Sequence, residues 1–131
     1  MAQAWKRREK RLEFVNGQGE KLVGSLVTAE SEAPGKTVVL CHGFSDHRDT
    51  AILHALTTKL DAAALSSFRF DFSGNGESEG RFEFGNYLKE RDDLRSAVQY
   101  LRDAGHDVHG IVGRHSLEGG PQWRRDASRA Q

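Results

Sequence analysis

Cysteine is almost absent from this sequence of 131 residues, because Cys41 is the only one. A single cysteine excludes an intramolecular disulfide, so a reducing compartment, the cytoplasm, is the expected location. No apolar run reaches the roughly 18 residues of a transmembrane helix, and the basic start lacks the apolar stretch of a secretory signal. The charges of the 19 basic and 19 acidic residues cancel, so we expect no nucleic-acid partner. We also expect no membrane span.

The sequence also lacks internal repeats and a metal-ligand pattern. None of its six histidines shares a predicted helical face with a second histidine and a carboxylate, so we expect no metal and no cofactor. Its length suits one domain with one core. We expect a basic, disordered leader at 1–10, the folded domain at 11–113, and a disordered tail at 114–131.

Hydrophobic patterning predicts an α/β fold. Apolar and polar residues alternate over 11–15 and 21–28, and the glycine-containing turn between them predicts a hairpin. Further patterns predict strands at 37–41, 67–72 and 109–113, and helices at 50–64 and 86–104. Strands that alternate with helices favour a parallel sheet with right-handed crossovers, here begun by the antiparallel hairpin, with helices on both faces.

Capping residues and apolar faces are predicted for both helices. Asp49 is placed to cap the first helix, and Asn86 the second. The first helix should bury one face made of Ile52, Leu53, Leu56, Leu60 and Ala63. The second should bury Leu94, Ala97, Val98 and Leu101, and it should stop at Gly105.

The first motif with chemical content is His42-Gly43-Phe44, directly after the buried strand at 37–41. Loops at the carboxyl ends of parallel strands are where open α/β sheets place ligand contacts. Gly43 would let the backbone approach a substrate, and the following amides could donate to a developing oxyanion. An ordinary turn between a strand and a helix explains the motif equally well.

The second motif is the glycine-rich segment 71–80, which follows another predicted strand. Gly74, Gly76 and Gly80 invite a dinucleotide-binding interpretation, but their spacing is one residue longer than the usual fingerprint. The segment also follows the second β-α unit, and no helix begins at its last glycine. A tight structural loop, with Asp71 hydrogen-bonded to its own turn, is the favoured interpretation.

The third motif places Ser116 among glycines after the strand at 109–113. This arrangement is typical of a nucleophile elbow, which needs small residues two positions before and two after the serine. Those positions hold Arg114 and Glu118, whereas Gly113 and Gly119 lie three positions away. Ser116 is therefore a candidate nucleophile in a disrupted elbow.

At these spacings, residues 11–113 resemble the α/β-hydrolase superfamily, in its serine esterase and lipase branch. The most similar members are plant-type proteins described as serine aminopeptidase-like or feruloyl-esterase-like. The most specific segments are 40–44 and 69–80. Because segment 69–80 is so similar to this superfamily, we favour the hydrolase interpretation of it over the dinucleotide-binding one.

Residue roles follow from this resemblance alone. It implies that the amides of Phe44 and Leu117 form the oxyanion hole, that His42 and Gly43 line the loop, and that Ser116 is the nucleophile. It also implies that Asp71, Gly74 and Gly76 form a structural glycine loop, so that neither Asp71 nor His42 belongs to the catalytic triad.

The resemblance implies a serine hydrolase of small-molecule esters or acyl groups. The triad order in this fold is Ser, then an acid, then His, and the last two are missing from the sequence, which predicts a truncated α/β-hydrolase that is inactive alone. An altered reading frame or splice near Arg114 would explain the divergent tail. The alternative is a non-catalytic variant that acts as a binding fragment or has no function. The open edge of the strand at 109–113 also predicts self-association.

Overall fold

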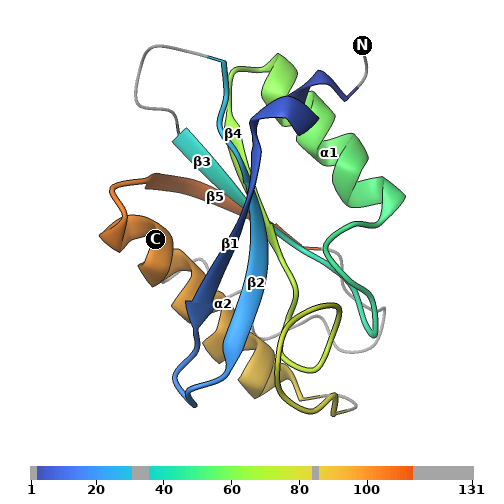
Figure 1. Ribbon diagram of the computed structural model, residues 1–131, viewed down its shortest axis with the longest axis vertical. Helices are drawn as coiled ribbons and strands as arrows, with labels where there is room; N and C mark the ends of the chain where they lie inside the picture. The colour runs from blue at the N-terminus through green and yellow to red at the C-terminus, as the bar shows by residue number, and fades with distance from the viewer. Residues whose placement is uncertain (1–2, 31–35, 84–85, 114–131) are drawn as a thin grey trace.

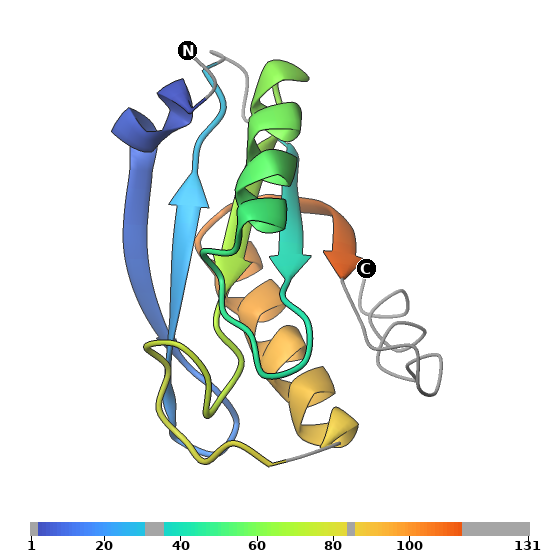
Figure 2. The same cartoon turned by 90° about the vertical axis from the view of Figure 1, so that its right-hand side faces the viewer.

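The residues that the structure describes fold into a five-stranded sheet with one α-helix on each face (Figures 1 and 2). The structure is a computed structural model that describes residues 3–30, 36–83 and 86–113. Its elements are η1 (Ala4–Arg8), β1 (Glu9–Val15), β2 (Lys21–Val27), β3 (Lys36–Cys41), α1 (Ala51–Ala62), β4 (Ser66–Phe70), α2 (Tyr87–Asp103) and β5 (Asp107–Gly113). No helix among these elements is long and apolar enough to cross a bilayer.

The strand order is β1-β2-β4-β3-β5, and the sheet is mixed. β2 pairs antiparallel with both β1 and β4, whereas β3 pairs parallel with both β4 and β5. The predicted antiparallel hairpin followed by parallel strands is therefore confirmed. In the register of the parallel strands, Cys41 lies opposite Phe70 on one side and Gly113 on the other. The carboxyl ends of the three strands consequently meet at one edge of the sheet.

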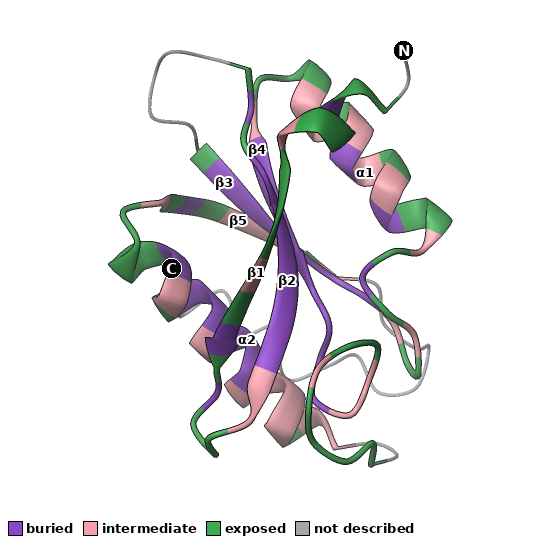
Figure 3. Ribbon diagram, in the orientation of Figure 1, coloured by how far each residue is buried: buried purple, intermediate pink, exposed green. Residues whose placement is uncertain are grey.

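Both faces of the central strands are buried (Figure 3). Side chains alternate along β3, so that Val39 and Cys41 join the core under α2, whereas Val38 and Leu40 pack against α1. The face of α2 contributes Leu94, Ala97, Val98 and Leu101 to the larger core, as predicted. Burial of the Cys41 side chain raises the pKa of its thiol, which suits a structural rather than a reactive cysteine.

The two helices differ in how well the sequence predicted them. The side chain of Asn86 accepts a hydrogen bond from the Lys89 amide at 3.1 Å and caps α2, as predicted. The cap of α1 is Thr50 rather than Asp49, because the carboxylate of Asp49 accepts from His54 and Arg69 instead. Ile52 was expected in the core but is 46% exposed, because α1 buries a narrower face around Leu53.

The expected disordered leader at 1–10 is wrong for the residues that the structure describes. Residues 4–8 form η1, and Trp5 is only 1% exposed. Its indole N–H donates to the hydroxyl of Thr58 at 2.9 Å, and Arg8 forms two hydrogen bonds with the carboxylate of Asp61. The basic composition of this segment gave no sign that Trp5 would be buried, and the burial of Trp5 fixes η1 on α1.

Arg69 is fully buried on the face of β4 that α1 and η1 cover. It lies on the opposite face of the strand from Phe68 and Phe70, which join the larger core. Its guanidinium binds the carboxylates of Glu9 and Asp49 and lies 5.1 Å from the centre of the Trp5 ring. Two carboxylates and an aromatic face thus compensate the burial of this charge.

Candidate active site

The segment after β3 forms a tight loop at the edge where the parallel strands end. Ser45 has a φ of 52°, in the left-handed region that residues with a side chain rarely adopt. The amide of Asp46 donates to the carbonyl of Gly43 at 3.3 Å and closes a turn. Such backbone strain is characteristic of functional loops when the surrounding structure holds it in place. We call residues 42–48 the oxyanion loop, after the role that the resemblance implies.

His42 is the buried first residue of this loop, and both of its ring nitrogens are hydrogen-bonded. The Phe72 amide donates to Nε2 at 3.1 Å, so the ring proton lies on Nδ1, which donates to the carbonyl of Gly43 at 2.7 Å. Burial lowers the pKa of the imidazole and so favours its neutral form. A histidine with both nitrogens engaged in this way orients the loop and is unavailable as a general base.

Arg48 joins the oxyanion loop to the glycine-rich loop 71–80. Its backbone amide donates to Oδ1 of Asp71 at 2.6 Å, and its Nη1 donates to Oδ2 at 2.5 Å. The remaining guanidinium groups donate to Ser25 on β2 at 2.9 Å and to Glu77 at 2.6 Å. Because Arg48 and Asp71 are both buried, these bonds fix the two loops against each other.

The glycine-rich loop is built around the Asp71 carboxylate. The Glu77 amide donates to Oδ2 of Asp71 at 3.0 Å, so the carboxylate accepts from its own turn as well as from Arg48. Gly76 has a φ of 52°, and a Cβ there would lie 2.4 Å from Cγ of Asp71. Gly74 has a φ of 80°, and a Cβ there would lie 2.3 Å from the Phe82 amide nitrogen. Both glycines thus permit close approaches that a side chain would prevent.

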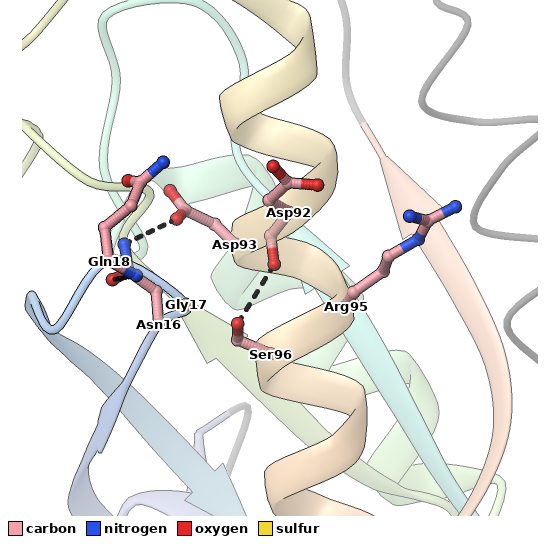
Figure 4. Close-up of a pocket in the computed structure, with 7 residues that line it drawn as sticks. All are labelled: Asn16, Gly17, Gln18, Asp92, Asp93, Arg95 and Ser96. Atoms are coloured by element: carbon pink, nitrogen blue, oxygen red, sulfur yellow. Dashed lines mark hydrogen bonds between the residues drawn. The ribbon is translucent and has the colours of Figure 1, made fainter.

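A second buried carboxylate, Asp93, ties α2 to two other segments. Its Oδ2 accepts from the amide and hydroxyl of Ser73 at 2.8 and 2.7 Å, and its Oδ1 accepts from Asn16 at 3.0 Å. A cavity of about 290 Å³ lies beside this contact, and the residues lining it come from the β1–β2 turn and from α2 (Figure 4). The lining residues are Asn16, Gly17, Gln18, Asp92, Asp93, Arg95 and Ser96. Asp93 is hydrogen-bonded to both Asn16 and Ser73, so we interpret the residues beside this cavity as a structural junction between α2 and these two segments.

Glu90 lines a smaller crevice beside the glycine-rich loop, together with Arg81 and Lys89. Burial and the neighbouring Asp93 raise the pKa of the Glu90 carboxyl to about 7. Burial also raises the pKa of Asp93 itself. The described residues contain no group of three or more His, Cys, Asp or Glu arranged to hold a metal ion.

The predicted site residues divide into two groups. His42, Gly43, Phe44, Asp71, Gly74 and Gly76 lie in the two loops at the carboxyl edge of the sheet. Ser116 and Leu117, with the disrupted elbow around them, lie outside the described residues. The sequence interpretation missed Arg48 and Asp93, because both look like ordinary charged residues of a surface loop and a surface helix.

The mixed sheet, the loop after β3 and the glycine-rich loop after β4 define a protein of the α/β-hydrolase fold. A scan against protein-family models finds no match to this sequence, and a search of the curated proteins finds none either. Solved structures do match. The Pyrococcus furiosus esterase Pf2001 is 26% identical, with a TM-score of 0.70 over 80% of this chain and 41% of that chain.

Two further structures share the fold at lower identity. Est1E from Butyrivibrio proteoclasticus, solved with ferulic acid bound, is 23% identical over 82% of this chain and 43% of that one, with a TM-score of 0.67. XC6422 from Xanthomonas campestris, a serine hydrolase without a lid, is 21% identical over 81% and 50%, with a TM-score of 0.69. The chain spans half or less of the length of each of these proteins. It has the fold of the N-terminal portion of an α/β-hydrolase, and its structural neighbours are esterases and serine hydrolases.

Proposed function

We propose that this chain supplies the oxyanion-loop portion of a serine hydrolase that acts on carboxylic esters or acyl groups. The observation that carries the proposal is the register of the parallel strands, in which Cys41 lies opposite both Phe70 and Gly113. The loop that begins at His42 therefore starts beside the end of β5, and Ser116 follows Gly113 by three positions. A nucleophile and an oxyanion donor must meet at one such edge.

In this mechanism the Ser116 hydroxyl attacks the ester carbonyl, and the Phe44 and Leu117 amides stabilise the oxyanion that forms. The hydroxyl needs a general base. His42 cannot serve, because both of its ring nitrogens are engaged. Residues 117–131 contain Glu118 and Asp126 but no histidine. We therefore propose that the 131 residues alone do not activate Ser116.

A non-catalytic role is the second candidate. The observation that favours it is the presence of Arg114 and Glu118 where an elbow requires small residues. Under this proposal the chain is a non-catalytic variant that acts as a binding fragment or has no function.

The test of the oxyanion donor removes the backbone N–H of Phe44. Residues 1–113 would be joined to the remainder of the Pyrococcus furiosus esterase after its corresponding strand, and hydrolysis of 4-nitrophenyl butyrate would be measured. Phe44→Pro deletes the amide N–H, so it should lower kcat by about 10²–10³. Phe44→Ala removes the ring but retains the N–H, so its kcat should fall far less than that of Phe44→Pro. An equal kcat in the proline and alanine variants would remove this loop from the mechanism.

A second test uses the 131-residue chain itself. A fluorophosphonate probe reacts with activated serines. We expect no labelling of Ser116, because the triad order of this fold places the acid and the base after the serine, and residues 117–131 contain no histidine. Labelling that is stoichiometric and is lost in Ser116→Ala would contradict the proposal that the base lies outside this chain.

A further inference from the structure

We infer that Phe44 and Phe82 together form a contact site for the apolar group attached to the ester carbonyl. The inference rests on the proposed hydrolase function and adds to it the side chains that would select the substrate. It assigns a role to Phe82, which the sequence interpretation did not single out.

The two rings are exposed, and they contact each other. Phe44 is 48% exposed and Phe82 is 40% exposed, although large aromatic side chains are usually well buried. Their ring centroids lie 5.5 Å apart at an interplanar angle of 68°, in an edge-to-face arrangement. The two residues come from different loops, so the fold brings together two aromatic side chains that are each partly exposed.

The backbone beneath Phe82 is fixed by the glycine-rich loop. Gly74 approaches the Phe82 amide so closely that a Cβ would lie 2.3 Å from its nitrogen, and the Gly74 amide donates to the Glu79 carbonyl at 2.9 Å. Arg48 joins this loop to the one that carries Phe44. The aromatic pair is therefore held in position before any ligand arrives, which lowers the entropic cost of binding.

The position of Phe44 indicates which chemical group would contact the two rings. Its backbone amide is the proposed oxyanion donor, and its ring belongs to the same residue. A carbonyl oxygen bound at that amide brings the group attached to the carbonyl carbon into reach of the Phe44 ring and its partner. A neutral alkyl or aryl group suits two exposed aromatic rings, because binding removes apolar surface of both molecules from water.

Butyrophenone is a suitable probe, because it carries a carbonyl and apolar groups but no leaving group. The full 131-residue chain would be titrated with it while the aromatic resonances of Phe44 and Phe82 are followed by NMR. We expect these two rings to shift first and the dissociation constant to rise at least about fivefold in Phe82→Ala and Phe44→Ala. Ile52→Ala is the matched control, since Ile52 is also a large exposed side chain, and it should leave the constant unchanged.

Acetone, which keeps the carbonyl but lacks the apolar group, should not shift the two rings. Phe82→Leu retains apolar surface and should bind more tightly than Phe82→Ala, and unchanged resonances elsewhere would show that each variant is folded. Binding that Phe82→Ala and Phe44→Ala do not weaken would overturn the inference, as would no binding at all. Butyrophenone binding at the two rings with no hydrolysis by the chimaera would uphold this contact site and overturn the hydrolase instead.

Discussion

Arg48 binds both carboxylate oxygens of Asp71, one through its backbone amide and one through its guanidinium. A single residue thus fixes the path of the oxyanion loop with its main chain and neutralises the buried carboxylate with its side chain. Other contacts hold the same loop, because the Phe72 amide donates to Nε2 of His42 and Arg69 donates to the carbonyl of Arg48. The Arg48–Asp71 pair is the contact that joins the loop to the glycine-rich loop 71–80.

Replacing Arg48 with alanine should destabilise the fold strongly. The side chain of Asp71 is fully buried, and the variant removes the guanidinium that balances its charge, leaving the two backbone amides of residues 48 and 77. Breaking a buried ion pair typically costs about 3–5 kcal/mol. Urea unfolding followed by circular dichroism measures the change. Arg11→Ala is the control, because Arg11 pairs with Glu13 on the exposed surface and its loss should cost far less. Equal losses in the two variants would show that the buried pair has no special role.

Gly76 and Gly105 provide a matched pair of substitutions. Both have positive φ, so alanine strains the backbone at either position by about 1 kcal/mol. A Cβ at Gly105 meets nothing within 4 Å, whereas at Gly76 it would collide with the Asp71 carboxylate. Gly76→Ala should therefore lose clearly more unfolding free energy than Gly105→Ala in the same urea experiment. Similar losses would mean that the loop moves away from Asp71 at little cost.

The free energy of unfolding should fall as the pH rises from about 4.5 to about 7, because the buried Glu90 carboxyl ionises in this range. Its pKa is 4.5 in the reference state and about 7 in the fold, so between these values the folded protein binds the proton more tightly than the unfolded chain does. Ionisation then costs folding free energy. Glu90→Gln should remove this loss and exceed the parent by about 1–3 kcal/mol at pH 8, with little difference at pH 4.

The control for Glu90 is Glu30→Gln, at an exposed position on another segment. The free energy of unfolding would be measured by urea at several pH values for all three proteins. Curves for Glu90→Gln and the parent that run parallel from pH 4 to pH 8 would exclude the proposed role of the Glu90 carboxyl.

The two outer strands of the described sheet should differ in how strongly they associate. Within residues 3–30, 36–83 and 86–113, β1 pairs only with β2, and β5 only with β3. β1 is protected by exposed charges, whereas β5 carries none after Asp107, and Val112 is 42% exposed. We propose that copies of the chain associate through β5. Val112→Lys should lower the mass found by light scattering toward that of one chain. Val15→Lys, on β1, should leave it unchanged.

The sequence predicted the elements whose patterns are local. The buried face of α2 follows from four apolar residues at helical spacing, and its cap follows from Asn86 alone. The hairpin between β1 and β2 was predicted from its turn residues. The positive φ of Gly74 and Gly76 agrees with the tight loop that their spacing predicted. In each case the signal lies within a few residues of the feature that it predicts.

Features that depend on distant partners could not be predicted in this way. Arg48 is buried because Asp71, Ser25 and Glu77 surround it, and nothing in residues 42–50 reveals those neighbours. Asp93 likewise looks like one of many charges on a polar helix until Asn16 reaches it from the β1–β2 turn. Burial of a charged group is decided by the tertiary structure, so a local pattern carries no trace of it.

The strand order also determines when the sheet can form during synthesis. β3 lies between β4 and β5, and both of these neighbours follow it in the chain. A nascent chain that has reached Cys41 has made an apolar strand with no partner, and it stays unpaired until Phe70 and then Gly113 leave the ribosome. Contacts of this kind are slow to form and leave apolar segments exposed. The segment 38–41 is thus available to a chaperone with affinity for short apolar stretches until β4 leaves the ribosome.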